Sequence, residues 1–226
     1  MTTPKSALGA LIDLSDPQNA AKMAAYHKVD RRYLGVSNPQ IDGLYKAWRK
    51  DTDIAQRVAI SAYLWDSDIH EARVAAAKLL TQARIADDGA VWDEICRWVP
   101  SFDAWAIADH ACFAGGRRLS AHPERIAQVE AWGDAENMWV RRAVLVMTLP
   151  WTKLNHPSQA DLEIRELILG RAASYVSDTE PFIQKSIAWW LRSLSKHDPD
   201  RVRVFIAEYG EKMKAFALKE ATAHLG

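Results

Sequence analysis

A short motif that recurs along the chain constrains its fold most: an apolar residue, any two residues, and then Ala or Ser, opening an apolar helix. It begins at Ile69, Trp105, Val140, Ile183 and Leu218. These positions are 36, 35, 43 and 35 residues apart, and such a period holds two helices and two short turns. Hairpins of this size cannot bury their apolar faces alone, so they stack on their neighbours. The spacing therefore predicts helical-hairpin repeats stacked into a curved α-solenoid.

Every strongly patterned segment carries apolar residues at three- and four-residue steps, which is typical of amphipathic helices. The segments predicted to be helical are 52–64, 69–83, 104–113, 139–149, 162–175 and 182–194. No convincing run of alternating apolar and polar residues indicates a strand. Gly115-Gly116 is expected to form a loop break after the third helix. We expect an all-α protein with a single domain over residues 1–226.

Composition excludes several classes of protein. Lys and Arg number 29 and Asp and Glu number 29, so bulk charge gives no hint of a nucleic-acid partner. The two cysteines make neither a disulfide framework nor a zinc ribbon, and they are typical of a reducing cytoplasm. The chain shows no signal peptide and no apolar run of about 18 residues. We therefore expect a cytoplasmic protein with no membrane partner, monomeric by default.

The second helix of each predicted hairpin would line the concave face of the solenoid. These helices carry two tryptophans, one carboxylate and several cations: Trp105, Asp109, Arg142, Lys185, Trp189 and Arg192. A groove with this composition suits a long anionic ligand.

The neighbours Trp189 and Trp190 cannot share one helix face, because adjacent helical residues differ by about 100° in direction. A regular apolar stripe leaves Trp189 out, between Lys185 and Arg192. The stripe consists of Ile183, Ile187, Trp190, Leu191 and Leu194. We predict that Trp190 lies in the core and that Trp189 faces the groove.

Further strings of residues are spread over nearly the whole chain, from about residue 20 to the end. They are Tyr26-His27-Lys28, Tyr33-Leu34-Gly35-Val36, Trp105-x-x-x-Asp109, Asn137-Met138-Trp139-Val140-Arg141-Arg142-Ala143, Phe182-Ile183-Gln184-Lys185-Ser186-Ile187-Ala188-Trp189 and Leu218-Lys219-Glu220-Ala221. The string at 182–189 is the most specific of them. In order and separation, the set resembles the landmarks of the AlkD-like DNA alkylation repair glycosylases.

The resemblance implies HEAT-like repeats that grip duplex DNA in a concave face. It also implies excision of purines alkylated at N3 or N7, without a metal or organic cofactor. The family's two tryptophans and aspartate at the damaged nucleotide map onto Trp105, Trp189 and Asp109. A tyrosine of the N-terminal helix maps onto Tyr26, and a DNA-contacting arginine maps onto Arg142.

These residue types suit that chemistry. Alkylation at N3 or N7 makes the purine cationic, so it departs as a neutral base and leaves an oxocarbenium-like sugar. An ionised Asp109 would stabilise this sugar electrostatically, and Trp105 and Trp189 would offer it their π faces. The cations Arg142, Lys185 and Arg192 are candidate phosphate contacts.

Other interpretations stay open. Asp109 is also consistent with a solvated or helix-paired carboxylate. The tryptophans are also consistent with core residues, and the cations with ordinary surface charges. Tyr26 is as consistent with a half-buried helix residue as with a lesion contact. The pairs Arg31-Arg32 and Arg117-Arg118 indicate solvated loops more often than flanking DNA contacts.

An alternative function is a non-catalytic repeat module that binds DNA structures or a protein partner. Ala106, where many members of the family have an acidic residue, and the neutral net charge favour it. His110 follows Asp109 directly and so forms no dyad with it, and the histidines show no metal-ligand spacing. The sequence leaves the preferred adduct open.

Overall fold

The computed structural model describes residues 1–225. Within this range, loops connect helices, an isolated bridge pairs Arg32 with Ile69, and there is no strand. The all-α prediction is confirmed. The chain divides into two compact units, Met1–Arg118 and Leu119–Gly226. Within residues 1–225, no helix has the length and apolarity to cross a membrane.

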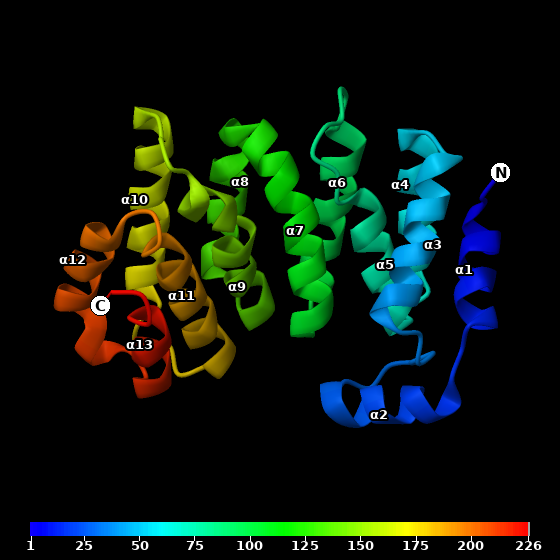
Figure 1. Cartoon of the computed structure of the whole chain (residues 1–226), viewed down its shortest axis with the longest axis horizontal. Helices are drawn as coiled ribbons and strands as arrows, with labels where there is room; N and C mark the ends of the chain where they lie inside the picture. The colour runs from blue at the N-terminus through cyan, green and yellow to red at the C-terminus, as the bar shows by residue number, and fades with distance from the viewer. Residues whose placement is uncertain (226) are drawn as a thin grey trace. The chain divides into compact units, whose positions relative to one another are not determined.

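The first unit contains six helices and most of a seventh (Figure 1). They are α1 Pro4–Asp13, α2 Pro17–His27, α3 Asn38–Lys50, α4 Ile54–Asp66, α5 His70–Leu80, α6 Gly89–Trp98 and α7 Trp105–Ala121. The helices α4 and α5 form a hairpin, against which α1, α3 and α6 pack. In contrast, α2 runs across the ends of α3 to α5 rather than alongside them.

The second unit contains the remaining helices, with 3₁₀ turns between them. They are α8 Ile126–Glu130, α9 Met138–Met147, α10 Gln159–Ser174, α11 Pro181–Leu194, α12 Pro199–Tyr209 and α13 Ala215–Ala221. Helix α11 is central, because it contacts α9, α12 and α13.

The recurring motif marks one helix in each predicted hairpin. One copy begins at Ile69, the residue just before α5, and the other four begin within the first four residues of α7, α9, α11 and α13. The small fourth residues Ala72, Ala108, Ala143, Ser186 and Ala221 are at most 1% exposed. Small side chains at these positions let each helix approach its neighbours closely, and the predicted hairpin period is confirmed.

The expected loop at Gly115-Gly116 is wrong, because α7 continues through both glycines to Ala121. Two glycines in a helix cost about 1 kcal/mol each relative to alanine. Continued burial offsets this cost, since Ala114, Leu119 and Arg118 are all fully buried. Sequence propensity alone does not register such a tertiary contribution.

Two arginines expected on solvated loops are instead buried. Arg118 is paired with Asp88 at 3.0 Å and also donates to the carbonyl oxygens of Gln82 and Ala83. The Arg31 side chain is 2% exposed and is paired with Asp68 at 2.8 Å and Asp103 at 2.7 Å. A buried guanidinium needs such partners to offset its desolvation. Arg118 joins α7 to the loop before α6, and Arg31 joins the loop after α2 to the loops before α5 and α7.

The connection between α2 and α3 is held by a buried carboxylate. Glu71, in the first turn of α5, is fully buried, and its two oxygens accept the backbone N–H groups of Leu34 and Gly35 at 2.9 and 2.7 Å. Gly35 has φ +81°, and a Cβ there would collide with the Asp16 carbonyl oxygen and lie 2.6 Å from the Ala20 nitrogen. Only glycine fits this close approach between the connection and the start of α2.

We expect Gly35→Ala to lower the free energy of unfolding by at least about 2 kcal/mol, from left-handed strain and the collision combined. Gly43→Ala is the matched control. Gly43 lies inside α3 and nothing would lie within 4 Å of an added Cβ, so this variant should gain about 0.5–1 kcal/mol. Urea unfolding of both variants measures the difference, and equal stabilities would contradict the assigned role of Gly35.

Candidate functional site

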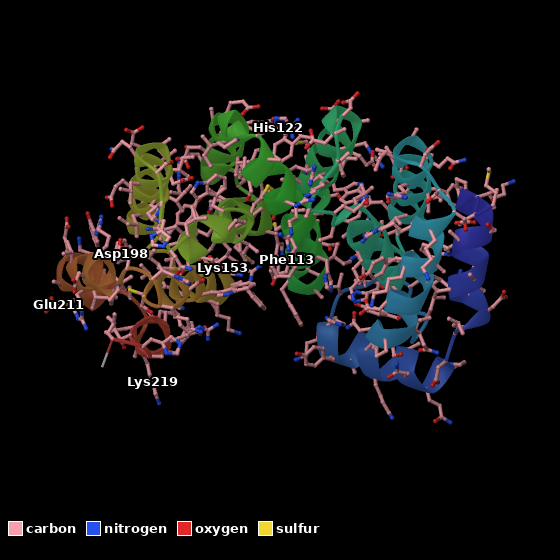
Figure 2. All side chains as sticks on the ribbon, turned by 45° about the horizontal axis from the view of Figure 1, so that its top comes forward. Phe113, His122, Lys153, Asp198, Glu211 and Lys219 are labelled. Carbon is pink, nitrogen blue, oxygen red and sulfur yellow. The ribbon has the colours of Figure 1, made fainter. Side chains whose placement is uncertain are left out.

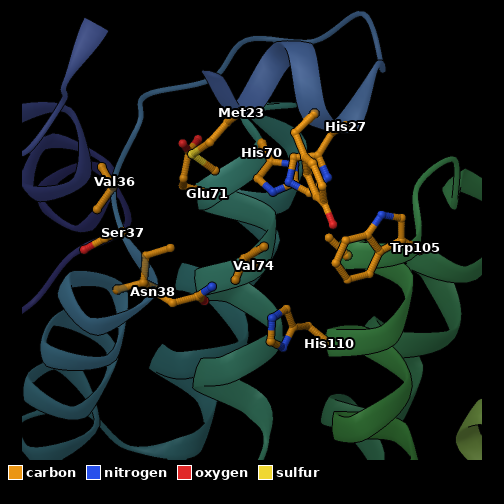
Figure 3. Close-up of a pocket in the computed structure, with 13 residues that line it drawn as sticks. Met23, His27, Val36, Ser37, Asn38, His70, Glu71, Val74, Trp105 and His110 are labelled. Carbon is orange, nitrogen blue, oxygen red and sulfur yellow. The ribbon is translucent and has the colours of Figure 1, made fainter. Parts of the chain in front are cut away.

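A cavity of about 340 Å³ lies between α2, α5 and α7 in the first unit (Figure 3). Five of its thirteen lining residues are aromatic or histidine side chains. Tyr26 and His27 come from α2, His70 from the start of α5, and Trp105 and His110 from α7.

The aromatic rings form one continuous cluster. Trp105 lies 6.3 Å from Tyr26 in an edge-on arrangement and 5.6 Å from His27, between ring centroids. His27 in turn lies 4.4 Å from His70, which stacks on Tyr33 at 5.0 Å. The cluster therefore joins α2 to both α5 and α7, and it brings Tyr26 and Trp105 together.

Helix α2 has no buried residue of its own, so its position depends on contacts at its two ends. At its N-terminus, the Asn19 side chain donates to the Gly35 carbonyl oxygen at 2.6 Å and the Asp16 N–H to that of Leu34 at 2.8 Å. Beyond its C-terminus, Arg31 reaches Asp103, two residues before α7. These contacts set the distance between Tyr26 and Trp105.

Asp109 follows Trp105 by one turn of α7, so the two side chains lie on one face of that helix. The Asp109 side chain is partly exposed. Ala106 and His110 line the cavity, whereas Asp109 is not among its lining residues. One further turn on, Phe113 is 40% exposed (Figure 2). The face of α7 that holds Trp105 thus continues into a carboxylate and an exposed aromatic side chain.

Burial keeps the cavity histidines uncharged at neutral pH. The pKa of His70 is lowered to about 3, mainly by desolvation and in smaller part by the nearby His27. Desolvation also lowers the pKa of His110 to about 4, with Lys78 adding to the effect. A neutral imidazole carries one donor and one acceptor nitrogen, so these walls offer hydrogen bonds without positive charge.

In the second unit, α11 confirms the prediction that Trp190 lies in the core and Trp189 lies off the buried stripe. Trp190 is fully buried together with Ile183, Ile187, Leu191 and Leu194, whereas Trp189 is partly exposed. Lys185 lies one turn before Trp189 and is exposed, with its Nζ 4.9 Å from the centre of the Phe182 ring. Arg192 lies about one turn after Trp189 and is paired with Glu220 at 2.8 Å.

The neighbouring arginines of α9 differ in their surroundings. Arg142 is only 5% exposed, and its guanidinium lies 6.0 Å from the centre of the Trp139 ring. Arg141 is paired with Asp178 at 3.0 Å and donates to the carbonyl oxygens of Ala135 and Glu136. Arg141 is thus held by loop contacts within its unit.

The structure thus places the predicted site residues in two groups. Tyr26, Trp105 and Asp109 lie in the first unit, and Lys185, Trp189 and Arg192 share α11 in the second. Sequence reasoning missed the cavity residues His27 and His70, although both lie within strings that it had singled out. Among the described residues, no three His, Cys, Asp or Glu side chains gather into a metal site. The two cysteines, Cys96 and Cys112, are free thiols.

Comparison with known proteins places these features in a family context. The family model described as "DNA alkylation repair enzyme" matches residues 7–225. No curated protein matches the chain.

Several solved structures share the fold. A predicted DNA alkylation repair enzyme from Enterococcus faecalis is 24% identical and superposes with a TM-score of 0.77, over 94% of this chain and 97% of that one. AlkD2 from Streptococcus mutans is 17% identical, with a TM-score of 0.60 over 92% and 96% of the two chains. The alkylpurine DNA glycosylase AlkC from Pseudomonas fluorescens, bound to DNA containing an abasic site analogue, is 16% identical. Its TM-score is 0.52, over 97% of this chain and 60% of that one.

The low pKa of His70 gives a pH prediction. The unfolded chain binds a proton at each histidine below a pH of about 6.5, whereas folded His70 does so only near pH 3. Folding stability therefore falls as pH decreases through this window, by up to about 1.4 kcal/mol per pH unit for such a group. We expect His70→Phe to make this fall shallower in urea unfolding between pH 7 and pH 5.

The exposed His224 provides the matched control, and His224→Phe should keep the slope of the parent protein. An unchanged slope in His70→Phe would contradict the buried, neutral state of His70.

Proposed function

Because the chain belongs to the DNA alkylation repair enzyme family, we propose that it is a DNA glycosylase that removes N3- and N7-alkylated purines from duplex DNA. The observation that carries this proposal is the face of α7. Trp105 lies there beside Tyr26, with the carboxylate of Asp109 one turn away. An aromatic pair and a carboxylate at one surface suit a cationic nucleotide.

The proposed reaction is hydrolysis of the N-glycosidic bond. The bond between C1′ and the purine nitrogen breaks, and both of its electrons stay with the base, which cancels the positive charge of the alkylated ring. Water attacks C1′, its oxygen forms the new bond, and it gives up one proton to the surrounding solvent. Asp109 has two roles: its negative charge stabilises the oxocarbenium-like sugar, and its carboxylate orients the water.

The indole rings contribute through their faces. Trp105 and Trp189 are proposed to contact the damaged nucleotide, where a cation–π contact contributes roughly 0.5–2 kcal/mol. The partly exposed position of Trp189, next to the exposed Lys185, supports this role. Tyr26, 70% exposed and edge-on to Trp105, is proposed to approach the lesion from α2.

Lys185, Arg192 and Arg142 are proposed to hold the duplex at its phosphates. The protein is proposed to act as a monomer and to need no cofactor. Lys185 fits this role best, because it is exposed. Arg192 would have to exchange its pairing with Glu220 for a phosphate. Arg142 is only 5% exposed and so offers little surface to a phosphate.

One observation favours the alternative of binding without catalysis. Ala106 lines the cavity next to Trp105, where the family resemblance expects an acidic side chain. A protein of this type would bind duplex DNA through the same α11 residues and release no base. The next experiment separates the two functions.

We expect Asp109→Asn to keep its affinity for DNA. The rate at which it excises 7-methylguanine should fall by about 10²–10³-fold, which is the usual effect of removing one electrostatic stabiliser. Single-turnover release of the base, measured beside equilibrium binding, separates the two effects.

Asp200→Asn is the control, because Asp200 is 91% exposed on α12, and it should keep both activities. Full excision by Asp109→Asn would remove Asp109 from the mechanism. An absence of excision in the parent protein, with binding retained, would favour the non-catalytic function.

Lys185→Gln should weaken binding to undamaged duplexes of any sequence. It should also lower the slope of log affinity against log salt by about 1, since one phosphate contact is lost. Lys5→Gln, at an exposed lysine of α1, is expected to leave the slope unchanged. Equal slopes for all three proteins would show that Lys185 makes no phosphate contact.

A further inference from the structure

Helix α7 is accessible along a single row of side chains. Within residues 105–119, every residue is buried except Trp105, Asp109, His110, Phe113 and Arg117. Apart from His110, these residues are spaced four apart, and side chains at this spacing form a continuous ridge inclined by about 26° to the helix axis. The α7 ridge, Trp105-Asp109-Phe113-Arg117, thus runs from the residues assigned to the lesion to an exposed aromatic ring and an exposed cation.

The second half of the α7 ridge exists because the helix continues through Gly115-Gly116. Just beyond the glycines, Arg118 is fully buried and paired with Asp88 at 3.0 Å, which holds this part of α7 in place. Its neighbour Arg117 points about 100° away around the helix axis and is exposed. The buried Arg118 therefore aligns Arg117 with Phe113 on the outer side of the helix.

Phe113 presents an aromatic ring next to the carboxylate of Asp109. It is 40% exposed, and its ring lies edge-on to that of His110, with the centroids 6.2 Å apart. Side chains on a helix lean toward its N-terminus, so the Phe113 ring covers the turn that holds Asp109, and the Arg117 side chain leans toward Phe113. Apolar surface and positive charge thus follow the carboxylate in that order.

The α7 ridge is longer than a single nucleotide requires. Trp105 and Arg117 are separated by about 18 Å along the helix axis, whereas a nucleotide of a duplex rises by about 3.4 Å along its strand. Trp105 and Asp109 suit one damaged nucleotide, so the rest of the ridge is available to the strand beside it. An arginine is well suited to a phosphate, because its planar guanidinium can donate two parallel hydrogen bonds.

We propose that Phe113 and Arg117 hold the damaged strand beside the lesion. Phe113 packs against the apolar face of an adjacent deoxyribose, and Arg117 binds a phosphate of the same strand. Contacts to sugar and phosphate fix the position of a strand without reading its sequence. They are positioning residues, which set C1′ of the damaged nucleotide against Asp109. This inference rests on the proposed function for the identity of the ligand as DNA.

Photocrosslinking tests where Phe113 lies on the strand. In the full-length protein, p-benzoylphenylalanine replaces Phe113, and the protein is bound to a duplex that contains a stable abasic-site analogue. We expect crosslinks to the strand that carries the analogue, within about two nucleotides of it, since one helical turn separates Phe113 from Asp109. The same replacement of Tyr63, which is also 40% exposed but lies on α4, should give none there. Crosslinks that are absent, evenly spread or confined to the complementary strand would overturn the proposal.

Binding measurements test the contact with the sugar. Phe113→Ala should weaken binding about ten-fold, or about 1.4 kcal/mol, to undamaged duplexes and to the abasic duplex alike, because both contain the deoxyribose. Phe113→Tyr keeps the ring and should bind as the parent protein does, as should Tyr63→Ala. A loss confined to the abasic duplex would indicate that the ring fills the place of the missing base, and it would overturn the sugar contact. Full affinity in Phe113→Ala would overturn it as well.

The salt dependence of binding tests the phosphate contact. Arg117→Gln should lower the slope of log affinity against log salt by about 1. Arg84→Gln is the matched control, because Arg84 is an exposed arginine in the loop before α6 of the same unit, and it should keep the parent slope. An unchanged slope in Arg117→Gln would show that Arg117 binds no phosphate.

None of these measurements requires excision, so the two proposals can fail separately. Crosslinks beside the abasic analogue from a protein that releases no base would refute the enzymatic function and leave the strand contact. Excision by a protein whose affinity, salt slope and crosslinks do not depend on Phe113 and Arg117 would leave the proposed function intact and refute the contact.

Discussion

The first unit depends on the buried carboxylate of Glu71 and the two backbone N–H groups that it accepts, from Leu34 and Gly35. Charge-assisted hydrogen bonds of this kind are among the stronger ones in proteins. They fix the connection that carries α2, and α2 has no buried residue to position it otherwise. Together with the pairing of Arg31 and Asp103, these hydrogen bonds position Tyr26 and His27 against Trp105.

The second unit uses a buried polar side chain in the same way. The carboxamide of Gln184, near the start of α11, donates to the carbonyl oxygens of Val176 and Asp178 and accepts the N–H of Lys214. It joins the loop before α11 to the loop before α13. In both units a buried polar residue at the start of a repeat helix thus holds the connecting loops, while the apolar stripes supply the core.

The sequence predicts the features that depend on periodicity. The stripe of α11 identifies both the helix and which of Trp189 and Trp190 is buried, because burial follows directly from direction around a helix axis. Helix α2 leaves no such signal, since it lacks a buried face. The contact between Tyr26 and Trp105 also escapes prediction, because it depends on long-range pairs such as Arg31 with Asp103, 72 residues apart. The burial of Arg118 is likewise fixed by Asp88, which only the folded chain brings close.

We propose that the face of α7 that carries Trp105 and Asp109 breaks the glycosidic bond of an alkylated purine. The most direct measurement incubates the purified protein with methylated duplex DNA and separates the released bases by chromatography. We expect 3-methyladenine or 7-methylguanine to appear above the level of spontaneous loss without protein. Release no faster than this background, from a folded protein that still binds the duplex, would contradict it.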